Sequence, residues 1–448
     1  MTCAEPLSVI GLGKLGLGFA ACLAKAGFDV LGVDLDPDLV ERINDKASAF
    51  DEPGIASAIA ATTGGTLHAA TEISKAVAHG DTAFVLLPTP SCHDGSFDSS
   101  TVVNALTNLC GAIRAQNKQR FLIVIASTVS PGTIAGTIVP IVESILERPI
   151  GETVSVCYSP EFVALGSVVA DFGRPDLILI GESHAASGAE VERILRRIVG
   201  SNPPVHHMSF VSAEIAKLAL NNFLTAKISY ANFLSQICSR VDGADIDAIT
   251  SALADDSRIG GKYLRAGPPF GGPCFPRDVR ALAAFAQQSG RPTDLLEAIS
   301  EINSAQQHSL AEKIFQQLQV LGVRSVGILG LSYNDTAPYV IESPSLALLK
   351  LLHAGGVHII AYDVRAMNAA LREAGDLFTP VATVDDCIQQ SSVVVLLSRD
   401  PAYIDAIVGY RGTCEKIVVD CWRALDPQAV DHNVKVVKFG FWDAVSQY

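Results

Sequence analysis

Short runs of β-branched and other apolar residues alternate with longer amphipathic segments through the N-terminal part of the chain. This alternation is typical of parallel strands that are each followed by a helix packed on the sheet. The predicted strands span residues 7–10, 30–33, 82–87, 121–126 and 177–180. We therefore predict an α/β fold that begins with a doubly wound parallel sheet.

The pattern changes in the middle of the chain. Residues 209–240 have apolar positions at helical spacing and no Pro or Gly, which predicts one long helix. A second strand–helix–strand unit then begins at residues 325–329, with a helix at 345–353 and strands at 357–362, 393–397 and 417–419. We predict two Rossmann-like domains, residues 1–205 and 306–448, joined by a central helical domain of residues 206–305.

Composition narrows the class of protein. Hydrophobic residues make up 49% of the 448-residue chain and charged residues 18%, which suits a compact globular protein. The net charge of -14 argues against nucleic-acid or acidic-membrane partners, which require a basic surface. No signal peptide or membrane-length apolar run is found, and the ten cysteines lack metal-ligand spacing. We expect a cytoplasmic protein with reduced thiols and no metal.

A glycine-rich turn directly after the first predicted strand indicates a dinucleotide site. Gly11 permits the tight turn, Gly13 allows the backbone to approach a pyrophosphate, and Gly16 lets helix and strand pack closely. Leu15 lies within the same turn. Asp34 follows Gly11 by 23 positions, at the end of the next strand, where a carboxylate binds the ribose 2′-hydroxyl and repels a 2′-phosphate. The cofactor is therefore predicted to be NAD.

The strongest candidate for a nucleophile is Cys274, in the segment Phe270–Asp278. A glycine pair precedes this cysteine and a charged pair, Arg277 and Asp278, follows it. A nearby cation and exposed backbone amides would favour the reactive thiolate. Asp278 could act as a base or position a water molecule. A lone cysteine is more often a small buried apolar residue, so the interpretation depends on the rest of the chain.

Several separated motifs resemble, in the same order, those of the UDP-glucose/GDP-mannose dehydrogenase family. They are Leu87–Pro90, Ser127–Val129, Pro160–Phe162, the helical set Glu214, Lys217, Asn221 and Lys227, Arg258–Gly260 with Tyr263–Leu264, and Phe270–Asp278. The resemblance extends from about Leu7 to Cys421. It implies an NAD-dependent enzyme that oxidises the 6-hydroxyl of a nucleotide sugar to a carboxylate.

The resemblance also implies a role for each matching residue. Thr89, Pro90 and Thr128 would lie beside the nicotinamide, with Thr128 near the transferred hydride. Cys274 would capture the aldehyde as a thiohemiacetal, and Glu161 would activate the water molecule that later hydrolyses the thioester. Lys217 would stabilise the developing oxyanion, and Asn221 would help to hold the same oxygen. The implied substrate-binding residues are Phe162, Lys217, Asn221, Arg258, Tyr263, Phe270 and Gly271.

Five positions depart from the family pattern. Leu165 stands where the family usually has Glu, and Arg277 where it has Lys. Asn334 and Ile341 replace a Lys and an Arg that normally contact the nucleotide diphosphate or the cofactor. The family's Asn–Glu pair on the long helix is Asn232–Phe233. UDP-glucose is the default substrate, with UDP-N-acetylhexosamines and GDP-mannose as alternatives.

Two other functions remain open at this stage. A single-hydride dehydrogenase of the β-hydroxyacid type would share the N-terminal domain and a catalytic Lys and Asn, but it needs neither Cys274 nor a second nucleotide-binding domain. A non-catalytic paralogue that binds a nucleotide sugar would explain the lost basic residues, but it has no need for Cys274, Asp278 and Lys217 together. We expect a homodimer built on the long helix, although this helix could equally be buried within one chain.

Overall fold

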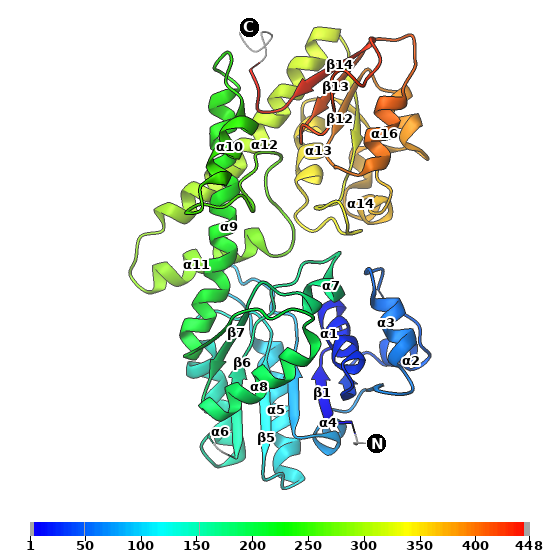
Figure 1. The fold of residues 1–448 in the computed structure, drawn as a ribbon. Helices are drawn as coiled ribbons and strands as arrows, with labels where there is room; N and C mark the ends of the chain where they lie inside the picture. The colour runs from blue at the N-terminus through cyan, green and yellow to red at the C-terminus, as the bar shows by residue number, and fades with distance from the viewer. Residues whose placement is uncertain (1–3, 49, 152, 443–448) are drawn as a thin grey trace. The chain divides into compact units, whose positions relative to one another are not determined.

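The computed structural model describes residues 4–48, 50–151 and 153–442. The chain forms two compact units (Figure 1). The first contains the chain up to Ala219 and the short segment Ala284–Ser289, and the second contains Leu220–Ala283 and the chain from Gly290 onward. The three-domain division at residues 205 and 305 stays a prediction.

The first unit contains an eight-stranded sheet in the order β3-β2-β1-β4-β5-β6-β7-β8. All neighbouring strands are parallel except β6 and β7. Its strands are β1 (Pro6–Ile10), β2 (Asp29–Val33), β3 (Leu67–Ala70), β4 (Thr82–Val85), β5 (Phe121–Ile125), β6 (Val154–Tyr158), β7 (Ile178–Glu182) and β8 (Val205–Met208). The five predicted strands are confirmed, whereas β3, β6 and β8 were not predicted.

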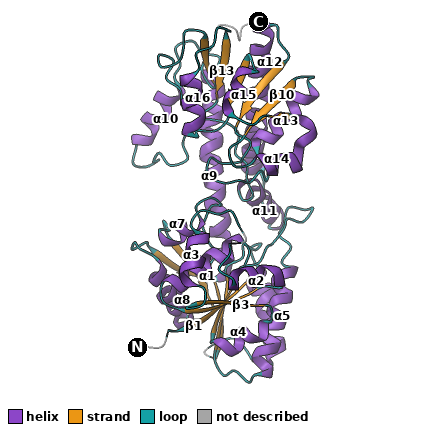
Figure 2. Cartoon of the chain, turned by 90° about the vertical axis from the view of Figure 1, so that its right-hand side faces the viewer, coloured by secondary structure: helices purple, strands orange, loops and turns teal. Residues whose placement is uncertain are grey.

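Helices cover both faces of this sheet (Figure 2). They are α1 (Lys14–Lys25), α2 (Pro37–Asn44), α3 (Ile55–Thr62), α4 (Ile73–His79), α5 (Ser100–Ala115), α6 (Val139–Leu146), α7 (Val168–Gly173) and α8 (Ala185–Ile198), with a π-helical turn at Ile134–Ile138. On β5, Leu122 and Val124 pack into one hydrophobic cluster and Ile123 into another. The central strands are therefore buried on both faces, as parallel sheets require.

The long helix predicted at residues 209–240 is α9 (Phe210–Cys238). Three further helices follow: α10 (Ile246–Asp255), α11 (Phe275–Gln288) and α12 (Asp294–Leu321). Several helix starts are specified locally by a capping residue followed by proline, namely Asp36–Pro37, Ser343–Pro344 and Asp400–Pro401. The capping side chain accepts a hydrogen bond from a first-turn amide, and proline fits the first helical position because no amide is needed there.

The second unit contains a six-stranded parallel sheet in the order β11-β10-β9-β12-β13-β14. Its elements are β9 (Ser325–Leu329), α13 (Pro344–Ala354), β10 (His358–Tyr362), α14 (Met367–Ala374), β11 (Thr379–Pro380), α15 (Val384–Gln389), β12 (Val393–Leu396), α16 (Pro401–Gly409), β13 (Lys416–Asp420) and β14 (Val434–Lys438). The prediction of two doubly wound sheets with intervening helices is confirmed.

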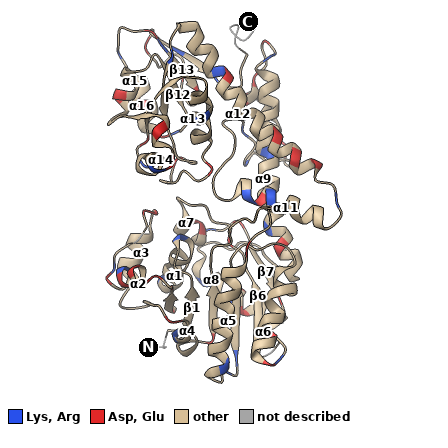
Figure 3. Cartoon of the chain, turned by 180° about the vertical axis from the view of Figure 1, so that it is seen from behind, with Lys and Arg blue, Asp and Glu red and all other residues tan. Residues whose placement is uncertain are grey.

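Lys and Arg occur singly or in small groups along both units (Figure 3). Within the described part of the chain, no helix is both long and apolar enough to cross a membrane. In residues 4–48, 50–151 and 153–442, no group of three or more His, Cys, Asp or Glu side chains is arranged to hold a metal ion.

Candidate active site

The three glycines of the first turn have three different surroundings. Gly11 has φ +90°, and a Cβ added there would lie 2.3 Å from the Leu86 carbonyl oxygen. A Cβ at Gly16 would lie 1.9 Å from the Gly11 oxygen, whereas one at Gly13 would meet nothing within 4 Å. Gly13 directly precedes α1, so open space lies above the exposed amides of a helix N-terminus. This cradle fits a dinucleotide pyrophosphate.

Asp34 and Asp363 close equivalent turns in the two sheets but differ in free acceptor capacity. Asp34 accepts hydrogen bonds from the amides of Leu12 (2.7 Å) and Asp36 (3.1 Å) and is partly exposed. Asp363 is buried and accepts from four amides, those of Leu331, Ser332, Arg365 and Ala366. A carboxylate offers about four lone-pair sites. Asp34 therefore retains acceptors for a ribose, whereas those of Asp363 are used within the fold.

Thr89 and Thr128 are brought together at the carboxyl ends of β4 and β5. The Thr89 hydroxyl donates to the Thr128 carbonyl oxygen at 2.6 Å. In the same segments, the Leu87 amide donates to the Ser127 hydroxyl at 2.7 Å, and the Pro90 carbonyl accepts from the Asp98 amide at 2.8 Å. Two sequence motifs about 40 positions apart thus form one hydrogen-bonded edge of the first sheet.

Lys217, Glu161 and Phe162 also meet in the first unit. The Lys217 ammonium donates to the Glu161 carbonyl oxygen and lies 4.3 Å from the centre of the Phe162 ring. Lys217 is 6% exposed, so its charge lies largely out of bulk water. A cation held in this way can stabilise negative charge that develops on a bound reactant.

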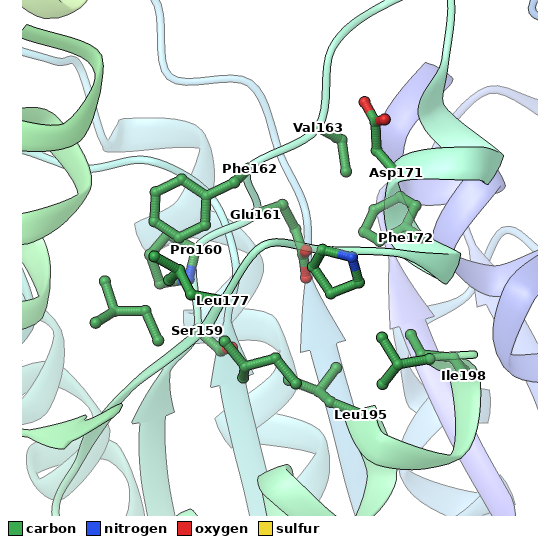
Figure 4. Close-up of a pocket in the computed structure, with 14 residues that line it drawn as sticks. Ser159, Pro160, Glu161, Phe162, Val163, Asp171, Phe172, Leu177, Leu195 and Ile198 are labelled. Carbon is green, nitrogen blue, oxygen red and sulfur yellow. The ribbon is translucent and has the colours of Figure 1, made fainter. Parts of the chain in front are cut away.

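The Glu161 side chain takes a different direction from its backbone. Figure 4 shows its carboxylate directed into a pocket between Pro160 and Phe172, with Leu195 and Ile198 also in the lining. The cavity measures about 30 Å³, which is enough for a water molecule. Burial raises the pKa of Glu161 to about 8, against the lowering effect of the Lys217 charge. A carboxyl group with this pKa can exchange protons near neutral pH.

Cys274, Asp278 and Asn221 form the corresponding group in the second unit. Cys274 is partly buried and directly precedes α11, and its carbonyl oxygen accepts from the Asp278 amide at 2.8 Å. The fully buried Asp278 carboxylate accepts from the Asn221 amide group at 2.6 Å and from Arg277 Nε at 3.2 Å. The positive end of α11 thus lies at the sulfur-bearing residue.

Polar side chains of α9 and α12 hold the segment before Cys274. Asn232 accepts from the Gly267 amide at 2.9 Å, and Gln306 donates to the Gly267 carbonyl at 2.8 Å. Asn303 makes both hydrogen bonds to the backbone of Phe270, at 2.8 and 3.0 Å. Sequence reasoning missed Asn303 and Gln306. Their spacing of three on one helix was the available signal in the sequence, and the structure shows that Gln306 is fully buried.

Only some of the predicted substrate-binding residues of the second unit lie close together. The rings of Tyr263 and Phe270 both pack edge-on against Phe275, with centroids 6.1 and 6.2 Å away. A Cβ at Gly271 would lie 2.2 Å from the Glu342 carbonyl oxygen, so only glycine fits there. The Arg258 side chain is 86% exposed and pairs with Asp256 at 2.6 Å. The role of Arg258 in substrate binding stays a prediction.

Three family models match the chain in succession, and they cover most of it. They are the NAD-binding domain at residues 5–199, the central domain at 211–305 and the UDP-binding domain at 327–427 of the UDP-glucose/GDP-mannose dehydrogenase family. The chain belongs to this family. It is an NAD-dependent nucleotide-sugar dehydrogenase.

Individual relatives match over nearly their whole length. The chain is 35% identical to UDP-glucose 6-dehydrogenase AglM of Haloferax volcanii, over 92% of this chain and 96% of that one. It is 28% identical to GDP-mannose 6-dehydrogenase of Pseudomonas aeruginosa, over 90% and 93%. Its fold is similar to a UDP-glucose dehydrogenase from Pyrobaculum islandicum, with a TM-score of 0.87, 30% identity and 99% of each chain covered.

Two positions where this dehydrogenase departs from the family pattern have structural partners. Leu165 packs against the hydrophobic core of the first unit. Beyond it, the buried Glu52 carboxylate accepts from the amides of Gly166 (2.7 Å) and Val168 (3.3 Å). Asn334 accepts from the amides of Thr336 and Ala337 and so closes a tight turn. Sequence reasoning missed Glu52 because its partners lie more than 110 positions away.

Arginines gather at the carboxyl edge of the second sheet of the dehydrogenase. Arg265 is exposed and donates to the Trp422 carbonyl at 2.8 Å, and the Arg399 guanidinium lies 4.8 Å from the centre of the Trp422 ring. Arg399 pairs with Asp335 at 2.9 Å, and Arg423 with Asp247 at 2.8 Å. Partial desolvation of the guanidinium, with the nearby charges of Arg423 and Arg399, lowers the pKa of Arg265. This concentration of positive charge favours an anionic ligand.

Proposed function

We propose that the protein oxidises the 6-hydroxymethyl group of a nucleotide sugar to a carboxylate, through a covalent intermediate on Cys274. The observation that carries the proposal is the position of Cys274 directly before α11, with the buried Asp278 in the first turn. The helix dipole favours a thiolate at this end, and a thiolate attacks aldehydes readily. A dehydrogenase that removes only one hydride has no use for such a nucleophile.

Each oxidation needs a hydride acceptor and a positively charged group that stabilises the negative charge on the substrate oxygen. NAD, when bound over Gly13 with its ribose on Asp34, accepts the hydride. Lys217 stabilises the oxygen anion left when the 6-hydroxyl loses its proton, because its ammonium is held in a largely buried position. Thr128, fixed through its carbonyl by Thr89, lies on the cofactor edge of the sheet. The product of the first oxidation is an aldehyde.

Capture and hydrolysis complete the reaction. The Cys274 sulfur adds to the aldehyde carbon, forming a C–S bond and a thiohemiacetal. Transfer of a second hydride from the thiohemiacetal carbon to a second NAD, and of the hydroxyl proton to water, would yield a thioester. Glu161 in its ionised form takes a proton from water, the hydroxide adds to the carbonyl carbon, and the C–S bond breaks to release the acid and the thiol. The Asp278 carboxylate accepts hydrogen bonds from Asn221 and Arg277, and it thereby fixes the position of the segment that carries Cys274.

UDP-glucose is our proposed substrate. The UDP-binding model matches the C-terminal sheet, and the relative from Haloferax volcanii with 35% identity is a UDP-glucose 6-dehydrogenase. UDP-N-acetylhexosamines and GDP-mannose are the alternatives, since GDP-mannose 6-dehydrogenase is also a relative.

The first experiment is the NADH yield per molecule of sugar consumed, over a panel of UDP-, GDP- and N-acetylated nucleotide sugars. Two NADH per sugar acid are expected, and the preferred sugar identifies the substrate. One NADH per sugar would favour the single-hydride dehydrogenase. No NADH with any member of the panel would favour a non-catalytic binding protein.

Arg265 and Arg399 are the proposed contacts of the substrate diphosphate, in place of the basic residues absent at positions 334 and 341. Arg265→Ala is expected to raise the KM for the nucleotide sugar about ten- to a hundredfold with little change in kcat, since one charge-assisted hydrogen bond is worth roughly 1.5–3 kcal/mol. Arg291→Ala, at an exposed arginine elsewhere in the second unit, is the control. Equal KM values for the two variants would exclude the assignment.

We also propose that the enzyme is a homodimer through α9. Phe223, Tyr230 and Ile237 repeat every seven residues along this helix and are 67%, 51% and 46% exposed. A stripe with this spacing suits pairing with a second helix. Light scattering would reject the proposal if it gave only the 47.2 kDa mass of one chain.

A further inference from the structure

A buried carboxylate at the start of α9 has no role in the chemistry described above. Glu214 is 0% exposed, and its two oxygens accept hydrogen bonds from the amides of Gly132 (2.6 Å) and Ile134 (2.8 Å). These amides belong to the turn that leaves the Thr128 segment and enters α6 through the π-helical turn. Burial raises the pKa of Glu214, while both hydrogen bonds oppose that rise.

Lys217 lies three positions after Glu214 on the same helix, so the two side chains share one face. Glu214 reaches the turn after Thr128, whereas Lys217 reaches the carbonyl of Glu161. The first turns of α9 therefore hold two loops that come from different strands, β5 and β6. Each loop carries one residue of the proposed reaction.

We propose that Glu214 is a positioning residue for the oxidation of the alcohol. It sets where Thr128 lies relative to the Lys217 ammonium, because the carboxylate and the ammonium project from the same helix face. This inference rests on the proposed function. Both carboxylate oxygens of Glu214 are needed to hold the turn, since each accepts a hydrogen bond from a different amide.

Glu214→Gln tests this role at almost constant volume. The glutamine oxygen can accept from one amide, but its NH₂ group would face the other amide, donor against donor. The turn should then loosen, and hydrogen exchange of the peptide that contains residues 130–134 should become faster. A misplacement of about 1 Å can cost on the order of 100-fold in rate. The first-turnover rate of NADH formation should therefore fall by about ten- to a hundredfold, with the Kd for NAD unchanged.

Two further variants complete the test. Glu214→Asp keeps both acceptors on a shorter side chain and should restore part of the first-turnover rate. Glu312→Gln makes the same chemical change at an exposed position of α12 and should behave as wild type. An unchanged first-turnover rate in Glu214→Gln would overturn the proposal. So would a fall in NAD affinity that parallels the fall in rate, because that pattern indicates a general loss of structure.

The outcome can be separated from a failure of the proposed function. If the wild-type protein forms no NADH with any nucleotide sugar, the proposed function fails, and the role of Glu214 in the reaction fails with it. Hydrogen exchange without substrate still decides whether Glu214 holds the turn at residues 130–134. If the wild type is active, the first-turnover rate and the NAD affinity of the variants together decide whether this contact serves the reaction.

Discussion

Replacing Cys274 by serine is expected to lower formation of the sugar acid by on the order of 10³-fold or more. A serine hydroxyl stays protonated near neutral pH and is a much weaker nucleophile than a thiolate, so the aldehyde is not captured. The first oxidation does not require the sulfur. The variant should therefore yield about one NADH per sugar and release aldehyde, measured by NADH absorbance and by trapping the aldehyde with a hydrazine.

Cys414→Ser provides the matched control for this variant. Cys414 is exposed and lies in the loop between α16 and β13 of the C-terminal sheet. It should retain the wild-type yield and rate. Two NADH per sugar from Cys274→Ser at the wild-type rate would rule out the covalent route.

Replacing Glu161 by glutamine is expected to slow thioester hydrolysis by about 10²- to 10⁴-fold, the range for a lost general base. The thioester on Cys274 should then accumulate and be seen by mass spectrometry of acid-quenched protein. In the wild type, the active carboxylate form increases as pH rises toward the Glu161 pKa of about 8. Hydrolysis should therefore fall about tenfold for each pH unit below this value, and the glutamine variant should lose this dependence.

The raised pKa of Glu161 also makes the free energy of unfolding depend on pH. The pKa of Glu161 in the fold, about 8, lies above the ordinary 4.5, so folding favours the protonated form. The stability that this group contributes is present below about pH 4.5 and is lost as the pH rises toward about 8. Denaturant unfolding at several pH values should show a smaller decline in Glu161→Gln. Equal declines in both proteins, with no thioester detected, would contradict the assignment of Glu161 as a buried base.

The elements that repeat a strong local pattern were predicted well. The strand–turn–helix at Gly11 and the long helix α9 are examples, because turn geometry and helical spacing are properties of neighbouring residues. Among the strands that were not predicted, β3 (Leu67–Ala70) and β8 (Val205–Met208) are four residues long, and histidines interrupt their apolar positions. They are strands because a neighbouring strand supplies their hydrogen-bond partners.

The residue types of the site were visible in the sequence, but their states and partners were not. The glycine turn, the acidic residue Asp34 and the segment around Cys274 could be predicted from the sequence, since each is a pattern of residues close together in the chain. The fold brings together groups that are distant in the chain: Asn221 donates to Asp278, Glu214 holds the turn after Thr128, and the Glu161 carboxylate lies in a pocket. Protonation and hydrogen-bond partners depend on groups distant in the chain and on exclusion of water, and a linear pattern contains neither.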